Sequence, residues 1–135
     1  MYSLNKIPTL QTFYVYALLD NNGTPFYIGV TVNHESRLHY HLSHIKRNEV
    51  VYDTHAVHLF ARERNFIPKM RILYIGTAMV RGGFGGRVEL NFKERQYIAK
   101  YKNEGHDLMN GISKEKYYKL YSINSEILEP KMVNA

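Results

Sequence analysis

The chain has 135 residues, 44% of them hydrophobic and 22% charged, a composition typical of one compact globular domain and not of a disordered chain. It contains no cysteine, which excludes disulfide bonds and cysteine-ligated zinc, and no apolar run approaches the roughly 20 residues of a membrane span. The net charge of +6 favours a polyanionic partner.

Two segments near the N-terminus predict a β-hairpin. Phe13–Leu19 and Pro25–Val30 are rich in aromatic and β-branched residues, as strands are. The Asn-Gly pair between them is a turn signal because both residue types tolerate positive φ. Pairing of these strands can bring Tyr16 and Tyr27 close together across the ladder. The two phenols fit ordinary packing as well as one wall of an active site.

The rest of the chain predicts helices and one further strand. Apolar spacing predicts a helix at His34–Arg47, with Asn33 as its N-cap, and a second helix at Asp53–Arg64. A strand is expected at Met70–Ile75, followed by a glycine-rich mobile loop at Gly76–Arg87. A further helix is predicted at Glu89–Glu104, ended by Gly105, and a short helix at Ser113–Leu120. We expect one domain over residues 1–135, with its core at about 12–112 and a C-terminal extension at 113–135. The fold class is α+β, a small three-stranded antiparallel sheet flanked by helices.

Apolar spacing also predicts which helical side chains face the core. We expect the inward residues to be Leu38, Leu42 and Ile45 in the first helix, Val57, Phe60 and Ala61 in the second, and Phe92, Tyr97, Ile98 and Tyr101 in the helix before Gly105.

Two polar side chains of the first helix share one face. Arg37 and His41 are four residues apart, so both can point the same way. If that helix crosses the sheet near Gly29, an arginine, a histidine and two phenols converge. The planar guanidinium fork suits a phosphate. A solvated arginine and a surface histidine are the alternative.

Glu94 is the candidate carboxylate. It shares the predicted inward face of Tyr97 and Ile98, where a carboxylate is costly unless it is paired or binds a metal. Lys93 and Arg95 could instead neutralise it. Asn110-Gly111, after this helix, fits a simple turn as well as a functional position.

In this order the segments Tyr14–Tyr16, Tyr27–Gly29, Arg37 with His41, Glu94–Ile98 and Asn110-Gly111 resemble the signature of the GIY-YIG nuclease superfamily. They span most of the chain. Phe13–Asp20 followed by Pro25–Gly29 is most similar to a branch of small bacterial and phage nucleases, which also includes the animal nucleases with ankyrin repeats and a LEM domain.

The resemblance implies a metal-dependent DNA endonuclease that hydrolyses phosphodiester bonds to 5′-phosphate and 3′-hydroxyl ends. The implied catalytic residues are Tyr16, Tyr27, Arg37, His41, Glu94 and Asn110. Glu94 would hold one Mg²⁺, for which Mn²⁺ could substitute, and no carboxylate cluster suggests a second metal. The resemblance also implies a cytoplasmic protein of a bacterial cell or phage-infected host.

Each implied residue has a role. Arg37 would bind the scissile phosphate, and Tyr16 would activate the attacking water, with Tyr27 as the close alternative. A free phenol is about 0.1% ionised at pH 7, so we expect Arg37 and the metal to favour its ionised form. His41 could take the proton onward, and Asn110 would support the site through hydrogen bonds.

Basic residues around this site are the candidate DNA contacts. They are Arg37, Lys46, Arg47, Arg81 and Arg87, the last two flanking a glycine-rich segment that suits a DNA-contacting arm or a connection without function. One such site nicks one strand, so a homodimer is possible.

Three other interpretations remain open at this stage. Paired histidines such as His41 with His44, or His55 with His58, have spacing for a shared zinc, but such pairs are common on ordinary surfaces. A non-catalytic nucleic-acid-binding module of the same fold is the alternative to an enzyme. A protein whose basic face binds an acidic partner is the third.

Overall fold

The structure, a computed structural model, describes residues 9–46, 56–80 and 85–111. Its sheet consists of β1 (Thr9–Leu19), β2 (Pro25–Thr31) and β3 (Lys69–Val80). The strands are antiparallel in the order β2-β1-β3, so β1 is central and β2 lies at an edge. The predicted α+β class with a three-stranded antiparallel sheet is confirmed.

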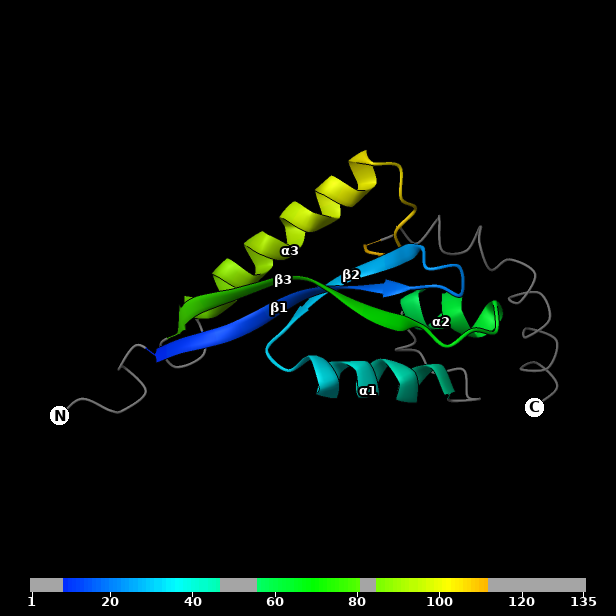
Figure 1. The fold of residues 1–135 in the computed structure, drawn as a ribbon, viewed down its shortest axis with the longest axis horizontal. Coiled ribbons are helices and arrows are strands. Elements are labelled where there is room, and N and C mark those ends of the chain that lie inside the picture. The colour runs from blue at the N-terminus through cyan, green and yellow to red at the C-terminus, as the bar shows by residue number, and fades with distance from the viewer. Residues whose placement is uncertain (1–8, 47–55, 81–84, 112–135) are drawn as a thin grey trace, which may run out of the picture.

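Three helices cover the two faces of this sheet. They are α1 (His34–Lys46), α2 (Ala56–Glu63) and α3 (Gly85–Asn103). In Figure 1, α3 lies on one side of the sheet, and α1 and α2 lie on the other. No helix among the described ranges is long and apolar enough to cross a membrane.

The hairpin between β1 and β2 turns on the side chain of Asp20. Its Oδ1 accepts hydrogen bonds from the backbone N–H groups of Asn22 and Thr24, at 2.8 and 2.9 Å. Gly23 has a φ of +78°, a conformation that favours glycine. The predicted turn is therefore confirmed, with an aspartate loop holding it.

Helix ends follow the capping signals of the sequence. Asn33 Oδ1 accepts from the N–H of Ser36 at 3.0 Å, which confirms Asn33 as the N-cap of α1. Gly105, with φ +95°, ends α3 in a Schellman motif, because its N–H bonds to Lys102 and the next N–H bonds to Tyr101. Asn65, with φ 54°, takes the corresponding place after α2.

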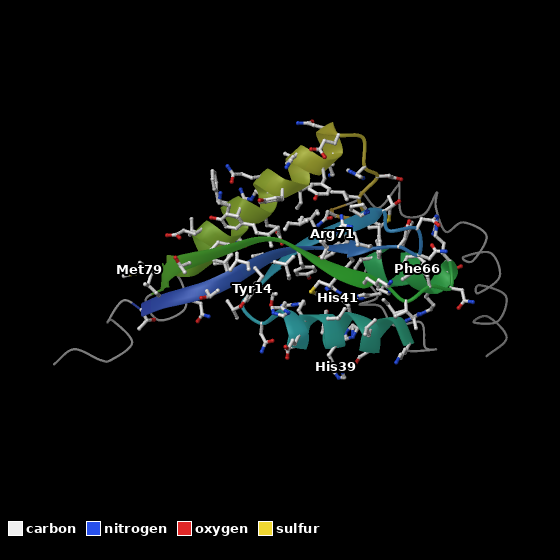
Figure 2. The ribbon with its side chains drawn as sticks, in the orientation of Figure 1. Tyr14, His39, His41, Phe66, Arg71 and Met79 are labelled. Carbon is white, nitrogen blue, oxygen red and sulfur yellow. The ribbon has the colours of Figure 1, made fainter. Side chains whose placement is uncertain are left out.

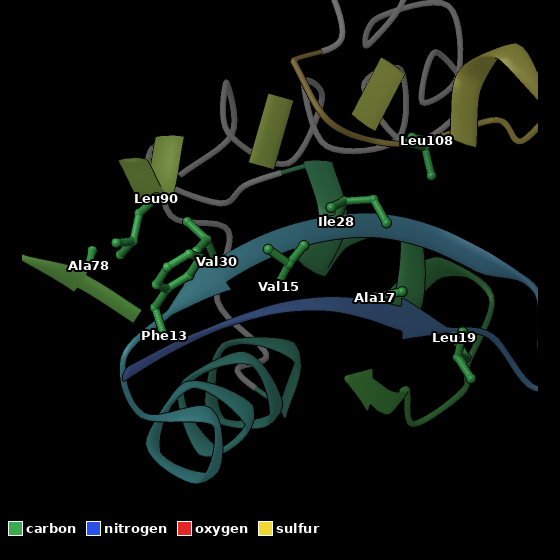
Figure 3. Close-up of a cluster of buried hydrophobic side chains, with 9 residues drawn as sticks. All are labelled: Phe13, Val15, Ala17, Leu19, Ile28, Val30, Ala78, Leu90 and Leu108. Carbon is green, nitrogen blue, oxygen red and sulfur yellow. The ribbon is translucent and has the colours of Figure 1, made fainter. Parts of the chain in front are cut away.

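The core has two layers, one on each face of the sheet. The layer under α3 is drawn in Figure 3 and consists of Phe13, Val15, Ala17, Leu19, Ile28, Val30, Ala78, Leu90 and Leu108. The layer under α1 and α2 consists of Tyr16, Leu18, Phe26, Val57, Ala61, Phe66 and Met109. Tyr16 thus belongs to the face that α1 covers.

The predicted loop at Gly76–Arg87 is wrong over most of its length. Gly76–Val80 continue β3, because the long β1 pairs with them as far as Thr9 opposite Val80. Gly76 fits there because it has no side chain to meet the rings of Phe13 and Tyr74. At the other end, α3 already begins at Gly85, before the predicted Glu89.

The predicted inward face of α3 is partly wrong. Phe92 is 61% exposed, whereas Leu90 is 4% exposed and packs in the core. Tyr97, Ile98 and Tyr101 pack partly buried against the same layer, as predicted. The predicted inward face of α2 is confirmed, with Val57 and Ala61 buried and Phe60 packed against them. In α1 only Ile45 of the three predicted residues packs against this layer, Leu38 and Leu42 are half-buried, and the buried residue is His41.

Candidate active site

The pairing of β1 with β2 places both phenols on the face covered by α1. Tyr16 pairs with Gly29 and Leu18 with Tyr27, so the two tyrosines are diagonal neighbours with ring centroids 6.3 Å apart. The expected proximity of Tyr16 and Tyr27 is confirmed. A side chain at position 29 would clash with the phenol of Tyr16, so only glycine leaves room for it.

Tyr16 is hydrogen-bonded to His41 of α1. The hydroxyl of Tyr16 lies 2.8 Å from Nε2 of His41, and both side chains are buried, at 2% and 3% exposure. Figure 2 shows His41 between α1 and the sheet, with His39 on the far side of the helix. His41 is therefore a buried partner of the phenol and not a surface histidine.

A second buried histidine continues this line. His58 of α2 is 1% exposed, and its Nε2 lies 2.8 Å from Nδ1 of His41. Tyr16, His41 and His58 thus form one hydrogen-bonded chain from the sheet through α1 to α2.

Arg62 holds the two helices that carry these histidines. Its Nε and Nη2 donate to the backbone carbonyls of Ile45 and His44, at 3.1 and 2.7 Å. Those carbonyls belong to the last turn of α1, where the backbone carbonyls have no hydrogen-bond donor within the helix. The guanidinium therefore ties the end of α1 to α2 and fixes the distance between His41 and His58.

Arg37 lies on the same helix as His41, one turn earlier. Its guanidinium carbon is 5.1 Å from the centre of the Tyr40 ring, a cation–π contact, and the side chain is half-buried. Its positive charge acts to lower the pKa of both Tyr16 and Tyr27. Arg37 and the two phenols therefore share one site, as the sequence suggested.

Glu94 reaches the same phenols from α3. Its side chain is half-buried, and its negative charge acts to raise the pKa of both Tyr16 and Tyr27. The helix that carries Glu94 packs on the face opposite to α1. The carboxylate and the guanidinium thus approach the edge strand β2 from different layers.

The net effect of the site is to keep both phenols neutral. Burial is the main cause that raises the pKa of Tyr16 and of Tyr27 above its ordinary value, and Arg37 only partly opposes it. The lowering by Arg37 that we expected is therefore present, but desolvation outweighs it. The hydrogen bond to Nε2 of His41 places an imidazole nitrogen in direct contact with the neutral phenol of Tyr16.

Asn110 closes the outer edge of β2. Its Oδ1 accepts from the N–H of Ile28 at 2.9 Å, and its Nδ2 donates to the carbonyl of the same residue at 2.6 Å. The N–H of Met109 also donates to the carbonyl of Phe26 at 2.7 Å. Asn110 thus extends the sheet with its side chain, between Tyr27 and Gly29, and is more than a turn residue.

Two of the predicted DNA contacts lie beyond the described ranges. Lys46 is exposed at the end of α1. Arg47 and Arg81 fall outside the described residues, and for Arg87 the structure describes only the backbone, in the first turn of α3. The predicted helix at Ser113–Leu120 and the C-terminal extension also fall outside them.

The described side chains offer few ligands for a metal ion. Within the described part of the chain, no three His, Cys, Asp or Glu side chains gather to hold a metal. A half-buried carboxylate beside a guanidinium and two phenols fits Mg²⁺, which binds through one or two carboxylates and keeps several waters. Glu94 is the carboxylate whose charge acts on both phenols.

Sequence reasoning missed the roles of His58 and Tyr40. The Tyr40 ring packs against His41, His44 and His58, with centroid distances of 5.4, 4.2 and 5.7 Å. A signal was present, because His58 follows Val57 and precedes Ala61 on the apolar stripe of its helix. The spacing suggested a metal pair with His55 instead of a partner for His41.

Comparison with known families agrees with this geometry. Residues 12–66 match the model of the GIY-YIG catalytic domain. The match covers less than half of the chain, from β1 through α2, and includes both phenols, Arg37 and His41. It supports the GIY-YIG superfamily, whose catalytic domain implies nuclease activity, and Glu94 and Asn110 lie beyond it. Neither the curated proteins nor the solved structures contain a significant match.

Proposed function

We propose that the protein is a Mg²⁺-dependent DNA endonuclease that leaves 5′-phosphate and 3′-hydroxyl ends. One observation carries this proposal: the hydroxyl of Tyr16 is hydrogen-bonded to His41 at 2.8 Å, within the electrostatic reach of Arg37 and Glu94. A proton acceptor, a cation for the phosphate and a carboxylate for a metal thus meet at one phenol. The match to the GIY-YIG catalytic domain supports the same chemistry.

Tyr16 is the general base of this proposal, acting together with His41. The phenol passes its proton to Nε2 of His41 and takes a proton from the attacking water. Because burial keeps the phenol neutral, the transfer depends on the short hydrogen bond that is already in place.

Tyr27 has a different position and a different proposed role. It is half-buried, and its ring lies 5.7 Å from that of His41, with no described hydrogen bond between them. We assign it to orienting the phosphate or the water beside Tyr16. The choice of Tyr16 as the base therefore depends on His41.

Arg37 and Glu94 have different proposed roles in binding the charged substrate. Arg37 lies on the α1 side, where its planar fork can hold two phosphate oxygens and stabilise the charge that develops on them. Glu94 lies on α3 and would hold the metal. When bound, Mg²⁺ would supply a Lewis acid for the phosphate and the leaving oxygen.

DNA is the proposed substrate because of the charge and the family match. The chain carries a net charge of +6, and a polyanion is the complementary partner. Arg37 lies on α1, and Lys46 is exposed at the end of the same helix. Both would contact the phosphate backbone of the DNA. One site cuts one strand, so we propose that a duplex break requires two copies or two successive events.

A plasmid assay tests the proposal against its two alternatives. Supercoiled plasmid is incubated with the protein and Mg²⁺, in parallel with EDTA and with Glu94→Ala. Nicking that requires Mg²⁺ and Glu94 supports the enzyme. A mobility shift without nicking would favour a binding module, and no interaction at low salt would favour a protein partner.

The ends of the product and the nucleic acid class need separate measurements. End-labelled duplex, single-stranded and branched DNA, with RNA of the same sequence, are cut in parallel. Ligation of the nicked product by DNA ligase without prior treatment is expected, because ligase requires a 5′-phosphate next to a 3′-hydroxyl. Products that need a kinase or a phosphatase first would contradict the proposed reaction.

A further inference from the structure

His58 is a buried histidine for which the proposed reaction has no role. It is 1% exposed, lies on α2, and touches neither a phenol of the sheet nor the proposed phosphate site by a described hydrogen bond. Its described hydrogen bond is to His41, the residue that receives the proton of Tyr16. Through this hydrogen bond, His58 can influence the proton transfer between His41 and Tyr16.

The two hydrogen bonds of His41 are coupled through its tautomer. A neutral imidazole has one N–H and one lone pair. If Nδ1 carries the hydrogen and donates to His58, then Nε2 is free to accept from Tyr16. If His58 donated instead, Nε2 would carry the hydrogen, and His41 could not accept the proton of the phenol.

We propose that His58 is a positioning residue that holds His41 in the Nδ1–H tautomer and stabilises its imidazolium after proton transfer. This inference rests on the proposed function of Tyr16 and His41. His58 accepts at Nε2, at a distance of 2.8 Å from His41 Nδ1, and thereby leaves Nε2 of His41 facing the phenol as an acceptor. It acts through His41 and does not touch the substrate.

The proton transfer balances within these three side chains. The O–H bond of Tyr16 breaks and an Nε2–H bond forms on His41, which gives a phenolate and an imidazolium. The positive ring then donates from Nδ1 to the neutral His58, a charge-assisted hydrogen bond.

A neutral acceptor suits this position better than a carboxylate would. Glu94 already acts to raise the pKa of Tyr16, and a second negative charge would add to that effect. An imidazole orients His41 without adding charge. The interior between α1 and α2, where His41 and His58 are 3% and 1% exposed, would also desolvate a carboxylate.

Other charged or titratable groups of the described structure lie around the pair on the sheet and on both helices. They include Tyr16 and Tyr27 from the sheet, Arg37, Tyr40 and His44 from α1, and Arg62 from α2. Arg62 is engaged with the carbonyls at the end of α1. The rings of Tyr40 and His44 pack on His58 at 5.7 and 5.1 Å and restrict its rotation.

Two substitutions separate an orienting role from packing. His58→Leu fills the space but leaves Nδ1 of His41 without its acceptor, and His58→Gln puts a carbonyl acceptor back near Nε2. We expect kcat of His58→Leu to fall about tenfold or more with KM unchanged, and His58→Gln to recover most of the loss. The control is His39→Gln, an exposed histidine of α1.

The pH profile gives a readout that loss of packing does not change. In His58→Leu the imidazolium of His41 loses its acceptor, so we expect the acid limb of kcat to move to lower pH. In His58→Gln and His39→Gln the limb is expected to stay at the wild-type position. If His58→Leu has the kcat and acid limb of His39→Gln, His58 is only a packing residue.

Imidazole ¹⁵N NMR tests the inference apart from nuclease activity. In the protein without metal or DNA, we expect His41 to be the Nδ1–H tautomer, and His58→Leu to shift it toward Nε2–H. An Nε2–H tautomer in the wild type would overturn the inference even for an active nuclease. An Nδ1–H tautomer in a protein that cuts no DNA would instead contradict the proposed function and leave the orienting bond intact.

Discussion

Gly29 lies directly opposite Tyr16 in the ladder between β1 and β2, and a Cβ at position 29 would overlap the hydroxyl of the phenol. The glycine is needed for space and not for backbone freedom. The ring of Tyr16 therefore rests on the bare backbone of the edge strand, where it can reach His41. The last residue of the Tyr-Ile-Gly motif thus serves the tyrosine of the other motif.

Gly29→Ala is expected to destabilise the fold and to abolish nicking. The new methyl group pushes the ring of Tyr16 away from His41, and overpacking of this kind costs about 1–3 kcal/mol. Urea denaturation measures the loss. In a Tyr16→Ala background the same substitution is expected to cost much less, because the clash is gone. Equal costs in the two backgrounds would show that the strain lies elsewhere.

Tyr16→Phe is expected to keep the fold and lose the reaction. The ring remains in the core, but the hydroxyl that bonds His41 is removed, so we expect nicking to fall about 100-fold or more. The control is Tyr14→Phe, two residues earlier on β1, whose half-buried ring packs edge-on against His34. Similar nicking rates for the two variants would return Tyr16 to a packing role.

Glu94→Ala is expected to abolish cleavage while DNA binding stays within a few fold of wild type. The carboxylate would hold the metal, whereas the affinity for DNA depends on positive charge, which this substitution does not remove. Glu89→Ala, on an exposed position of the same helix, is the matched control. Nicking rates and gel-shift affinities are measured at one salt concentration. Wild-type cleavage by Glu94→Ala would exclude this residue as the metal ligand.

Stability is expected to fall as the pH rises above about 10. The pKa of Tyr16 and that of Tyr27 are raised in the folded protein, so the unfolded chain loses these protons first, at its ordinary pKa of about 10. Their contribution is fully present below that pH and is lost above it. Urea midpoints between about pH 8 and 11 measure the slope, which should be shallower in Tyr16→Phe/Tyr27→Phe. An unchanged slope would mean that other groups cause it.

Asn110→Ala is expected to lower stability by about 1–3 kcal/mol and to reduce nicking. It removes two hydrogen bonds and leaves the N–H and carbonyl of Ile28 without their partner at the edge of β2. Since Ile28 lies between Tyr27 and Gly29, the motif around it loses its support. Asn103→Ala, an exposed asparagine at the end of α3, serves as the control. Identical thermal midpoints for the two variants would contradict this role.

The sequence was sufficient for features that depend on local signals. The hairpin follows from two β-rich segments around a turn, and Asn33 and Gly105 cap their helices as their residue types suggest. The proximity of Tyr16 and Tyr27 also follows from pairing in a hairpin. The conformation of these elements is determined by residues that are close in sequence, so tertiary contacts change it little.

Features that depend on distant partners were not predictable in this way. The strand at Gly76–Val80 exists because Thr9–Phe13 pair with it, and residues 76–87 alone suggest a flexible loop. His58 could not be recognised because its significance depends on the packing of α2 against α1, which Arg62 joins by hydrogen bonds. The bonds of Asn110 join residues 82 positions apart, beyond any periodicity.

That separation between Asn110 and Ile28 has a consequence for the order of folding. Strand β2, which bears Tyr27 and Gly29, can pair with β1 early because only a short turn separates the two strands. Its outer edge is completed only when Met109 and Asn110, which follow α3, form their hydrogen bonds to it. Closing so long a loop is entropically costly and is favoured late. We therefore expect the site to mature last, so that a shortened chain ending before Asn110 would bury its phenols yet lack the finished edge.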